Sequence, residues 1–472
     1  MIRMIIKSNQ VKATEIYTDG GKPLYLFAPG YFLNKDLYSV YQKIGQQIEY
    51  SELLAWMRHK YIGDATIIEN QLKKALGTLY QRDLLTCDNL ELDNYDAQIE
   101  RESALTEKYG FFPITQIDII VTKRCNFNCK HCYLDFEEKI TENIDIEKWI
   151  QACDKLSHYG LQSVVITGGE PLTCSNLITL IIHLLQKNIK VIMLTNGYLF
   201  DKSFIDALQP YKKLITIQVS LDGSNPTSHD HQRNKQGAFE VTTQNVRLLK
   251  ENGICVVLSM VLSDFNSEDI LDGSMFMLAR DLGVDMLGIT PHIIKNGNAI
   301  DSNIEIDEYK LLDIVDFVHN YEFDDSFPII TISGPPSITK ELSLSHLDIN
   351  RPRCRRGINS FAIRPDGRIV TCSDFAEIHY NEYDYGNIFE TDFPLIIRKA
   401  KEVQESIMRQ YSRIKGVCSV CTALKNCGGA CRADAYAEYG DILAPYPLCQ
   451  KLFEKGCFPP GMVDNLKEYK NV

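Results

Sequence analysis

Short apolar runs alternate with amphipathic stretches through the middle of the chain, between about residues 114 and 320. The runs rich in β-branched residues predict strands, and they read QIDIIVT, SVVIT, KVIMLT, LITIQVS, ICVVLSMVL and MLGIT. Stretches such as DIEKWIQACDKLSHYG and GAFEVTTQNVRLLKENG lie between them and show helical spacing. This alternation indicates a parallel sheet. We predict an α/β fold built on a partial (β/α)6 TIM-like barrel, with its chemistry at the C-terminal ends of the strands.

The first 85 residues follow another pattern. MIRMIIK, TEIYT and PLYLFA predict strands, and residues 35–48, 51–61 and 65–85 predict helices, the last with Asp64 as its N-cap. This order predicts a winged-helix-like domain over residues 1–85. A small packing cap on the barrel is the alternative. Residues 86–113 are polar and acidic and are predicted to form a linker.

The last part of the chain, residues 321–472, is predicted to hold a bridging segment and then a loop-rich domain. FAIRPDGRIVTC predicts a hairpin that turns at Asp366 and Gly367. The cysteines that follow have spacings typical of metal sites.

Charge and hydropathy limit the function classes. The net charge of −12 argues against nonspecific nucleic-acid binding, which needs a basic surface. The longest apolar stretch, LITLIIHLL, is too short to span a membrane, and the N-terminus lacks the apolar length of a secretory signal. We therefore expect a cytoplasmic protein that binds neither nucleic acid nor membrane.

Fifteen cysteines are many for a chain of 472 residues, and ten of them fall into two patterned groups. The first group is Cys125, Cys129 and Cys132, directly after the strand QIDIIVT. A [4Fe–4S] cluster takes four protein thiolates when it is fully ligated, so three leave one iron open to a small molecule. A zinc site completed by His131 or by a distant residue is the alternative.

This Cys-x3-Cys-x2-Cys loop after the first strand of an α/β barrel resembles the radical S-adenosylmethionine (SAM) enzymes. The resemblance implies that the open iron is chelated by SAM. It further implies that one electron from the cluster cleaves SAM to a 5′-deoxyadenosyl radical, which abstracts hydrogen from a substrate. His131 matches the family's aromatic position near the adenine.

Polar residues at the other strand ends fit the same resemblance. TGGEP supplies Gly168, Gly169, Glu170 and Pro171, which the family uses around the amino group of SAM. A Gly-Gly turn is the structural alternative. The remaining candidates for SAM contacts are Asn196, Ser220, Asp222 and Arg233. An Asp-Gly turn explains Asp222 equally well, and a solvated loop arginine explains Arg233.

The second group consists of seven cysteines after residue 350. Their spacing resembles the SPASM domain, which holds two auxiliary iron–sulfur clusters. The resemblance implies an outer cluster on Cys418, Cys421, Cys427 and Cys449, and an inner one on Cys354, Cys372 and Cys431. Cys457, Asp374 or a substrate would complete the inner set. A zinc ribbon explains only four of the seven cysteines.

The three-part layout resembles maturases of ribosomally made peptides. It implies a precursor peptide whose leader docks on residues 1–85, three [4Fe–4S] clusters, and an electron donor such as flavodoxin or ferredoxin. The expected product is a cross-link, with a cysteine thioether favoured. The alternatives are a C–C or C–O cross-link, an anaerobic sulfatase-maturing enzyme, a tetrapyrrole-modifying enzyme and a metal scaffold without activity.

Overall fold

The computed structural model describes residues 5–8, 13–17, 23–27, 31–33, 35–60, five positions between 72 and 79, 85–87, 116–132, 145–157, 161–291, 306–324, 326–335, 360–376, 383, 385–459 and 462–463. The chain forms two compact units. One comprises Met1–Thr115 with Lys155–Gln162, and the other comprises Gln116–Asp154 with Ser163–Val472.

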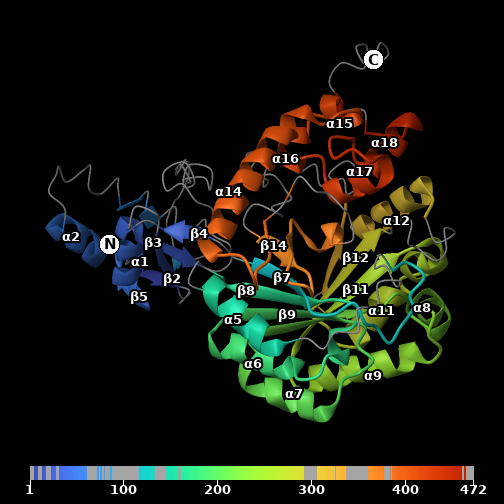
Figure 1. Cartoon of the computed structure of the whole chain (residues 1–472), viewed down its shortest axis with the longest axis horizontal. Helices are drawn as coiled ribbons and strands as arrows, with labels where there is room; N and C mark the ends of the chain where they lie inside the picture. Colours follow the sequence, from blue (N-terminus) through green and yellow to red (C-terminus); the bar gives the residue numbers. More distant parts are fainter. Residues whose placement is uncertain are drawn as a thin grey trace. The chain divides into compact units, whose positions relative to one another are not determined.

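A nine-stranded sheet is the centre of the larger unit (Figure 1). Every neighbouring pair runs parallel except the last, β14 with β15. The spatial order is β13 (Ile329–Ile332), β12 (Met286–Pro291), β11 (Cys255–Leu262), β10 (Ile215–Ser220), β9 (Lys190–Thr195), β8 (Ser163–Thr167), β7 (Gln116–Ile120), β14 (Ser360–Ile363) and β15 (Ile369–Val370).

Alternation along the strands separates the two faces of the sheet. In β10, Ile215, Ile217 and Val219 are buried, whereas Gln218 and Ser220 are half-buried. The buried set packs under the outer helices, and the other set faces the barrel interior. The helices of this layer are α5 (Ile146–Ser157), α6 (Leu177–Gln186), α7 (Lys202–Leu208), α8 (Pro226–Arg233), α9 (Ala238–Glu251), α10 (Glu268–Leu271), α11 (Ser274–Asp281) and α12 (Glu308–Asn320).

The sheet confirms the α/β fold and the partial barrel expected from the sequence. SVVIT and KVIMLT match β8 and β9 residue for residue. The parallel sheet also continues past the predicted barrel end at residue 320, because β13 and β14 both join it. Strands β14 and β15 form the expected hairpin around Asp366 and Gly367.

The C-terminal part of the larger unit is helical and rich in loops. One long amphipathic helix, α14 (Phe393–Gln410), leads into short helices that carry the cysteines (Figure 1). These are α15 (Val417–Val420), α16 (Leu424–Cys427), α17 (Arg432–Tyr439) and α18 (Pro447–Glu454). Among the described residues, no helix is both long and apolar enough to cross a bilayer.

The smaller unit contains two three-stranded antiparallel sheets. Apolar residues of its helices and of one strand form a separate core that includes Ile44, Leu53 and Leu76. Its elements are β1 (Ile5–Ser8), β2 (Ala13–Tyr17), β3 (Pro23–Phe27), β4 (Tyr31–Leu33), α1 (Lys35–Ile44), β5 (Gln47–Glu49), α2 (Tyr50–Lys60) and β6 (Leu85–Cys87).

The sequence prediction for this unit was partly wrong. The helix expected over residues 35–48 ends at Ile44, because the chain turns at Gly45 and enters β5. Strands β4 and β6 were not predicted. The linker was predicted over residues 86–113, but residues 86 and 87 belong to β6. Asp64 and residues 88–113 lie outside the described residues, and the winged-helix assignment stays a prediction.

Candidate active site

A cavity of about 410 Å³ opens at the C-terminal ends of the barrel strands. It brings together most of the residues predicted at the SAM site. Those among its lining residues are Cys125, Cys129, His131, Cys132, Gly168, Gly169, Asn196, Ser220 and Arg233. This arrangement agrees with the rule that such barrels place their sites at the strand C-termini.

The three-cysteine loop leaves the end of β7 and folds over a small apolar cluster. Phe127 is 5% exposed and packs with Cys129 and Ala238. The amide of Phe127 donates to Cys125 Sγ at 3.4 Å, and the amide of Cys132 donates to the carbonyl of Cys129 at 3.2 Å. Burial raises the pKa of the Cys125 thiol to about 11 and also raises that of Cys129. A bound metal must therefore displace these protons.

The TGGEP segment is fastened to the cysteine loop through its backbone. Gly169 donates to the carbonyl of Thr122 at 2.7 Å, and Glu170 donates to the carbonyl of Arg124 at 2.8 Å. A Cβ at Gly168 would lie 2.4 Å from the Thr122 oxygen, and one at Gly169 would lie 2.2 Å from the Arg124 oxygen. The glycines are therefore required by close backbone packing, and they line the cavity as well.

The Glu170 side chain is fully buried and is not among the cavity-lining residues. Its carboxylate accepts from the amides of Leu172 at 3.0 Å and Asn196 at 2.7 Å, and from the Thr195 hydroxyl at 2.8 Å. Burial raises the pKa of Glu170 although these donors act in the opposite direction. Glu170 thus joins the ends of β8 and β9. The neighbouring Pro171 is buried and begins a short 3₁₀ turn.

Asp222 lies behind the cavity wall and holds an arginine that faces the cavity. Its Oδ2 is 2.6 Å from Arg233 Nε, and its Oδ1 accepts from the Val261 amide at 2.8 Å. His131 Nε2 lies 3.8 Å from the same carboxylate. Burial alone would lower the pKa of Arg233, but Asp222 and Cys129 outweigh it and hold that pKa above its usual range. Arg233 is therefore an ordered cation and not a solvated loop arginine.

Asn196 and Ser220 both reach the cavity. The side-chain Nδ2 of Asn196 donates to Asn126 Oδ1 at 2.8 Å, and this bond links the end of β9 to the cysteine loop. The sequence analysis did not single out Asn126, nor Gln218 of β10, which also lines the cavity. Gln218 precedes Ser220 by two residues, so strand periodicity alone would have placed it on the same face.

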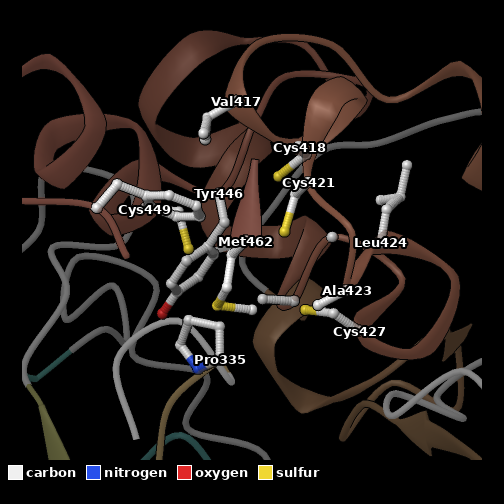
Figure 2. A pocket seen from close by; sticks show the side chains of 13 residues that line it. Pro335, Val417, Cys418, Cys421, Ala423, Leu424, Cys427, Tyr446, Cys449 and Met462 are labelled. Atoms are coloured by element: carbon white, nitrogen blue, oxygen red, sulfur yellow. The ribbon is translucent and has the colours of Figure 1, made fainter. Parts of the chain in front are cut away.

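The four cysteines that the resemblance to the SPASM domain assigned to the outer cluster line one pocket. Figure 2 shows the side chains of Cys418, Cys421, Cys427 and Cys449 pointing into one pocket, with Tyr446 beside them. Burial raises the pKa of the thiols of Cys418 and Cys421. Three buried thiols and the half-buried thiol of Cys421 around one pocket fit an iron–sulfur cluster, whose protein ligands are cysteine thiolates.

The inner set lies in a second pocket. Cys372, Cys431 and Asp374 line it together, with Cys431 Sγ 4.0 Å from Asp374 Oδ2. Cys354 lies outside the described residues. Cys457 is not among the described residues that line either pocket, and its Sγ contacts the carbonyl of Lys455 at 3.7 Å.

A tight turn directs two cysteines into the two pockets. Gly428, Gly429 and Ala430 all have positive φ angles between Cys427 and Cys431. Ala430 lines both pockets. Because of this left-handed turn, Cys427 points into the first pocket and Cys431 into the second. An alanine in this conformation is strained, whereas a glycine is not.

The two halves of the candidate site match known protein families. Residues 119–273 match the Radical SAM superfamily, and residues 354–422 match SPASM, an iron–sulfur cluster-binding domain. These two domains imply SAM and iron–sulfur clusters as cofactors. The three-cysteine loop and the two cysteine pockets fit such groups.

Two relatives carry names for different products, a bacteriocin in one case and heme in the other. The antilisterial bacteriocin subtilosin biosynthesis protein AlbA of Bacillus subtilis is 29% identical over 319 residues, which is 64% of this chain and 65% of AlbA. The aligned part is thus just under two thirds of AlbA. An AdoMet-dependent heme synthase of Nitratidesulfovibrio vulgaris is 26% identical over 348 residues, which is 70% of this chain and 90% of that enzyme.

Among solved structures, Streptococcus suis SuiB bound to its precursor peptide SuiA has the same fold. The TM-score is 0.66 at 18% identity, and the match covers 95% of this chain and 100% of SuiB. The chain therefore contains a radical SAM domain, and an SPASM iron–sulfur cluster-binding domain follows it.

Proposed function

We propose that this enzyme is a peptide maturase that installs a cross-link in a ribosomally made precursor, through the sulfur of a substrate cysteine. One observation carries the proposal. Asp374 lines both the large cavity and the pocket of Cys372 and Cys431. A substrate that enters the cavity therefore meets the SAM side and the inner cysteine pocket across one shared residue.

Each side of this arrangement has its own task. Cys125, Cys129 and Cys132 would hold the SAM-binding cluster, and with SAM bound this cluster would supply a radical able to abstract hydrogen from carbon. Arg233, fixed by Asp222, presents a positive charge to the cavity that suits the carboxylate of SAM. His131, which lines the cavity, would lie beside the adenine. Gly168 and Gly169 let the backbone approach the ligand.

The inner pocket suits a substrate thiolate. Cys354, Cys372 and Cys431 would supply three thiolates to a [4Fe–4S] cluster. One iron would then stay open to the substrate, and iron binds a soft thiolate well. Asp374 Oδ2 lies 4.0 Å from Cys431 Sγ, at the side of the pocket that faces the cavity. The outer set of Cys418, Cys421, Cys427 and Cys449 would hold a third cluster.

The smaller unit is proposed to bind the leader of the precursor. Both of its sheets have three strands, and an extended peptide can add a strand to the edge of such a sheet. The fold shared with SuiB extends over 95% of this chain, and SuiB was solved with its precursor peptide. The leader would then hold the core peptide at the mouth of the cavity.

Mass spectrometry tests the proposal. A candidate precursor encoded beside this gene is co-expressed anaerobically with the enzyme, and we expect a loss of two hydrogens and one free thiol per cross-link. A precursor without its leader should stay unmodified while SAM cleavage persists. An unchanged full-length precursor, with intact clusters and SAM cleavage, overturns the proposal.

A tetrapyrrole is the second candidate substrate, favoured by the match to the heme synthase. Incubation with an iron porphyrin in place of the peptide separates the two functions. A chemically changed porphyrin, together with an unmodified peptide, would establish the second function in place of the first.

A further inference from the structure

A buried carboxylate in the first strand of the barrel has no part in the site described above. Asp118 is 2% exposed and lies in β7, between Val165 of β8 and Ala362 of β14. A carboxylate in such a place lowers the stability of the fold unless its oxygens accept hydrogen bonds. Gln116 Nε2 donates to Asp118 Oδ1 at 3.4 Å. The other oxygen, Oδ2, accepts from a distant part of the chain.

The second donor is the hydroxyl of Ser373, 255 residues further along the chain. Ser373 Oγ donates to Asp118 Oδ2 at 3.2 Å. Ser373 begins the short 3₁₀ turn Ser373–Phe375, directly after Cys372. Whereas Asp118 is buried, Ser373 is half-buried and lines the large cavity, as does Asp374 beside it. Asp118 thus acts on the cavity through the Ser373 hydroxyl.

This hydrogen bond determines what the Ser373 hydroxyl offers to a ligand. A hydroxyl has one proton to donate and two lone pairs that accept. Because the proton is directed to Asp118, the lone pairs are left for a group in the cavity. The carboxylate of Asp374, when ionised, also only accepts. Ser373 and Asp374 therefore form an acceptor pair in the cavity wall.

The acceptor pair favours a ligand that donates hydrogen bonds over one that carries carboxylates. Among the described residues that line the cavity, Arg233 is the only lysine or arginine, and the proposed function assigns it to the carboxylate of SAM. A second carboxylate at the acceptor pair would have neither a donor nor a cation beside it, which costs free energy. Porphyrin propionates are carboxylates, whereas a peptide backbone supplies an N–H at almost every residue.

We propose that Ser373 determines substrate specificity by accepting a hydrogen bond from a backbone N–H of the core peptide, and that Asp118 positions its hydroxyl. The inference rests on the proposed function and deepens it, because it names the group of the precursor that is recognised here. Ser373 follows Cys372, which lines the inner cysteine pocket. An N–H bound by Ser373 would thus hold the peptide beside the pocket proposed to take the substrate thiol.

The test removes the donor and the acceptor separately. The substrate is the candidate precursor encoded beside this gene, with single backbone amides of its core replaced by esters through synthesis and ligation. An ester lacks the N–H and adds no bulk. The enzyme variants are Ser373→Ala, Asp118→Ala and Asp118→Asn. The control is Ser203→Ala, because exposed Ser203 also donates to an aspartate, Asp201 at 2.6 Å, and is not among the described residues that line the cavity.

In the wild type, an ester at one core position should raise KM about five- to tenfold with kcat nearly unchanged, because the lost hydrogen bond holds the bound substrate. Ser373→Ala should raise KM for the unaltered precursor by the same factor, and the ester should then add nothing. Ser203→Ala should match the wild type. All variants should cleave SAM at the wild-type rate without peptide, which checks that the SAM site is intact.

The two Asp118 variants separate positioning from a structural role. Asp118→Ala should lose most of the sensitivity to the ester, because nothing then directs the Ser373 proton away from the cavity. Asp118→Asn keeps an acceptor oxygen for Ser373 and should retain that sensitivity. A structural role alone would raise KM or lower kcat for the amide and ester substrates alike. If Asp118→Ala does not fold, Ser373→Ala and Asp118→Asn still provide the test.

Three results would overturn the inference while the proposed function stands. The first is a wild type with the same KM for every ester precursor as for the unaltered one. The second is full ester sensitivity in Ser373→Ala. The third, which removes the role of Asp118, is full ester sensitivity in Asp118→Ala. A wild type that cleaves SAM but leaves the unaltered precursor unmodified overturns the proposed function, and this inference with it.

Discussion

Arg233 and Asp222 form a buried ion pair with Nε and Oδ2 2.6 Å apart, and Asp222 is fully buried. The arginine uses its other end to reach Cys129 Sγ at 3.7 Å. One carboxylate thus sets the position of a cation that faces both the cysteine loop and the cavity. The alternatives from sequence were an Asp-Gly turn for Asp222 and a solvated loop arginine for Arg233. The structure instead pairs the two side chains.

Replacing Asp222 by Asn should leave a buried guanidinium without its counter-charge. Loss of one partner of a buried pair costs roughly 3–5 kcal/mol. We expect this loss in the unfolding free energy by urea titration, together with weaker SAM binding by calorimetry. Asp281→Asn breaks the exposed pair with Arg280, at 3.0 Å, and should cost less than about 1 kcal/mol. Equal stability of both variants contradicts this interpretation of the pair.

His229 should make the larger unit sensitive to mild acid. It is fully buried, and its Nδ1 accepts from the Asp222 amide at 3.1 Å. Burial, followed by the nearby charge of Arg233, lowers its pKa to about 3. Between this pKa and about 6.5 the unfolded chain binds the extra proton, so the unfolding free energy falls as the pH falls.

From pH 7 to pH 5, His229 should remove about 2 kcal/mol of stability. His229→Asn keeps an acceptor for the Asp222 amide and should flatten this part of the pH profile. His59→Asn, on the exposed face of α2, is the matched control and should leave the profile unchanged. Parallel profiles of the wild type and His229→Asn would show that the buried imidazole is not responsible.

Glu170→Gln tests whether the buried carboxylate stabilises the fold by joining the ends of β8 and β9. Its Oε2 accepts from the Asn196 amide at 2.7 Å, and one of the two carboxylate oxygens must become an NH₂ donor in the variant. The new NH₂ group would then face a donor that Glu170 now accepts from, such as the Asn196 amide. An unpaired donor in a fully buried site should lower the unfolding free energy by about 1–3 kcal/mol. We expect a lower unfolding free energy in the protein without cofactors. A variant of normal stability that has lost only SAM affinity would instead mean direct contact with the ligand.

Gly429→Ala should disturb both auxiliary cysteine pockets. Its φ is +76°, and an added Cβ would lie 2.6 Å from Ile414 Cδ1. The turn that separates Cys427 from Cys431 must then shift, so we expect less iron and sulfide per chain by chemical analysis. Gly440→Ala has a similar φ of +65° but no neighbour within 4 Å, and should retain the full content. Equal iron content in the two variants would contradict the role of this turn.

Local patterns predicted the elements well, whereas contacts between distant residues escaped them. Periodicity of β-branched residues predicted β8 and β9 to the residue, and the resemblance to the SPASM domain implied the cysteine group in Figure 2. Strand β5 was missed because Gln47–Glu49 continues the polar and apolar rhythm of the preceding helix. The role of Glu170 depends on Asn196, a partner on another strand, which no local pattern reveals.

The pairing of β14 with β7 imposes an order on synthesis of the protein. Each strand from β8 to β13 pairs with the strand made just before it, so the sheet can grow while the ribosome is still translating. The outer edge of β7, beside the three-cysteine loop, is covered only when residues 360–363 emerge, about half a chain later. Until then the nascent protein exposes an unpaired strand edge beside free thiols. A pause of translation before residue 360 would therefore favour aggregation.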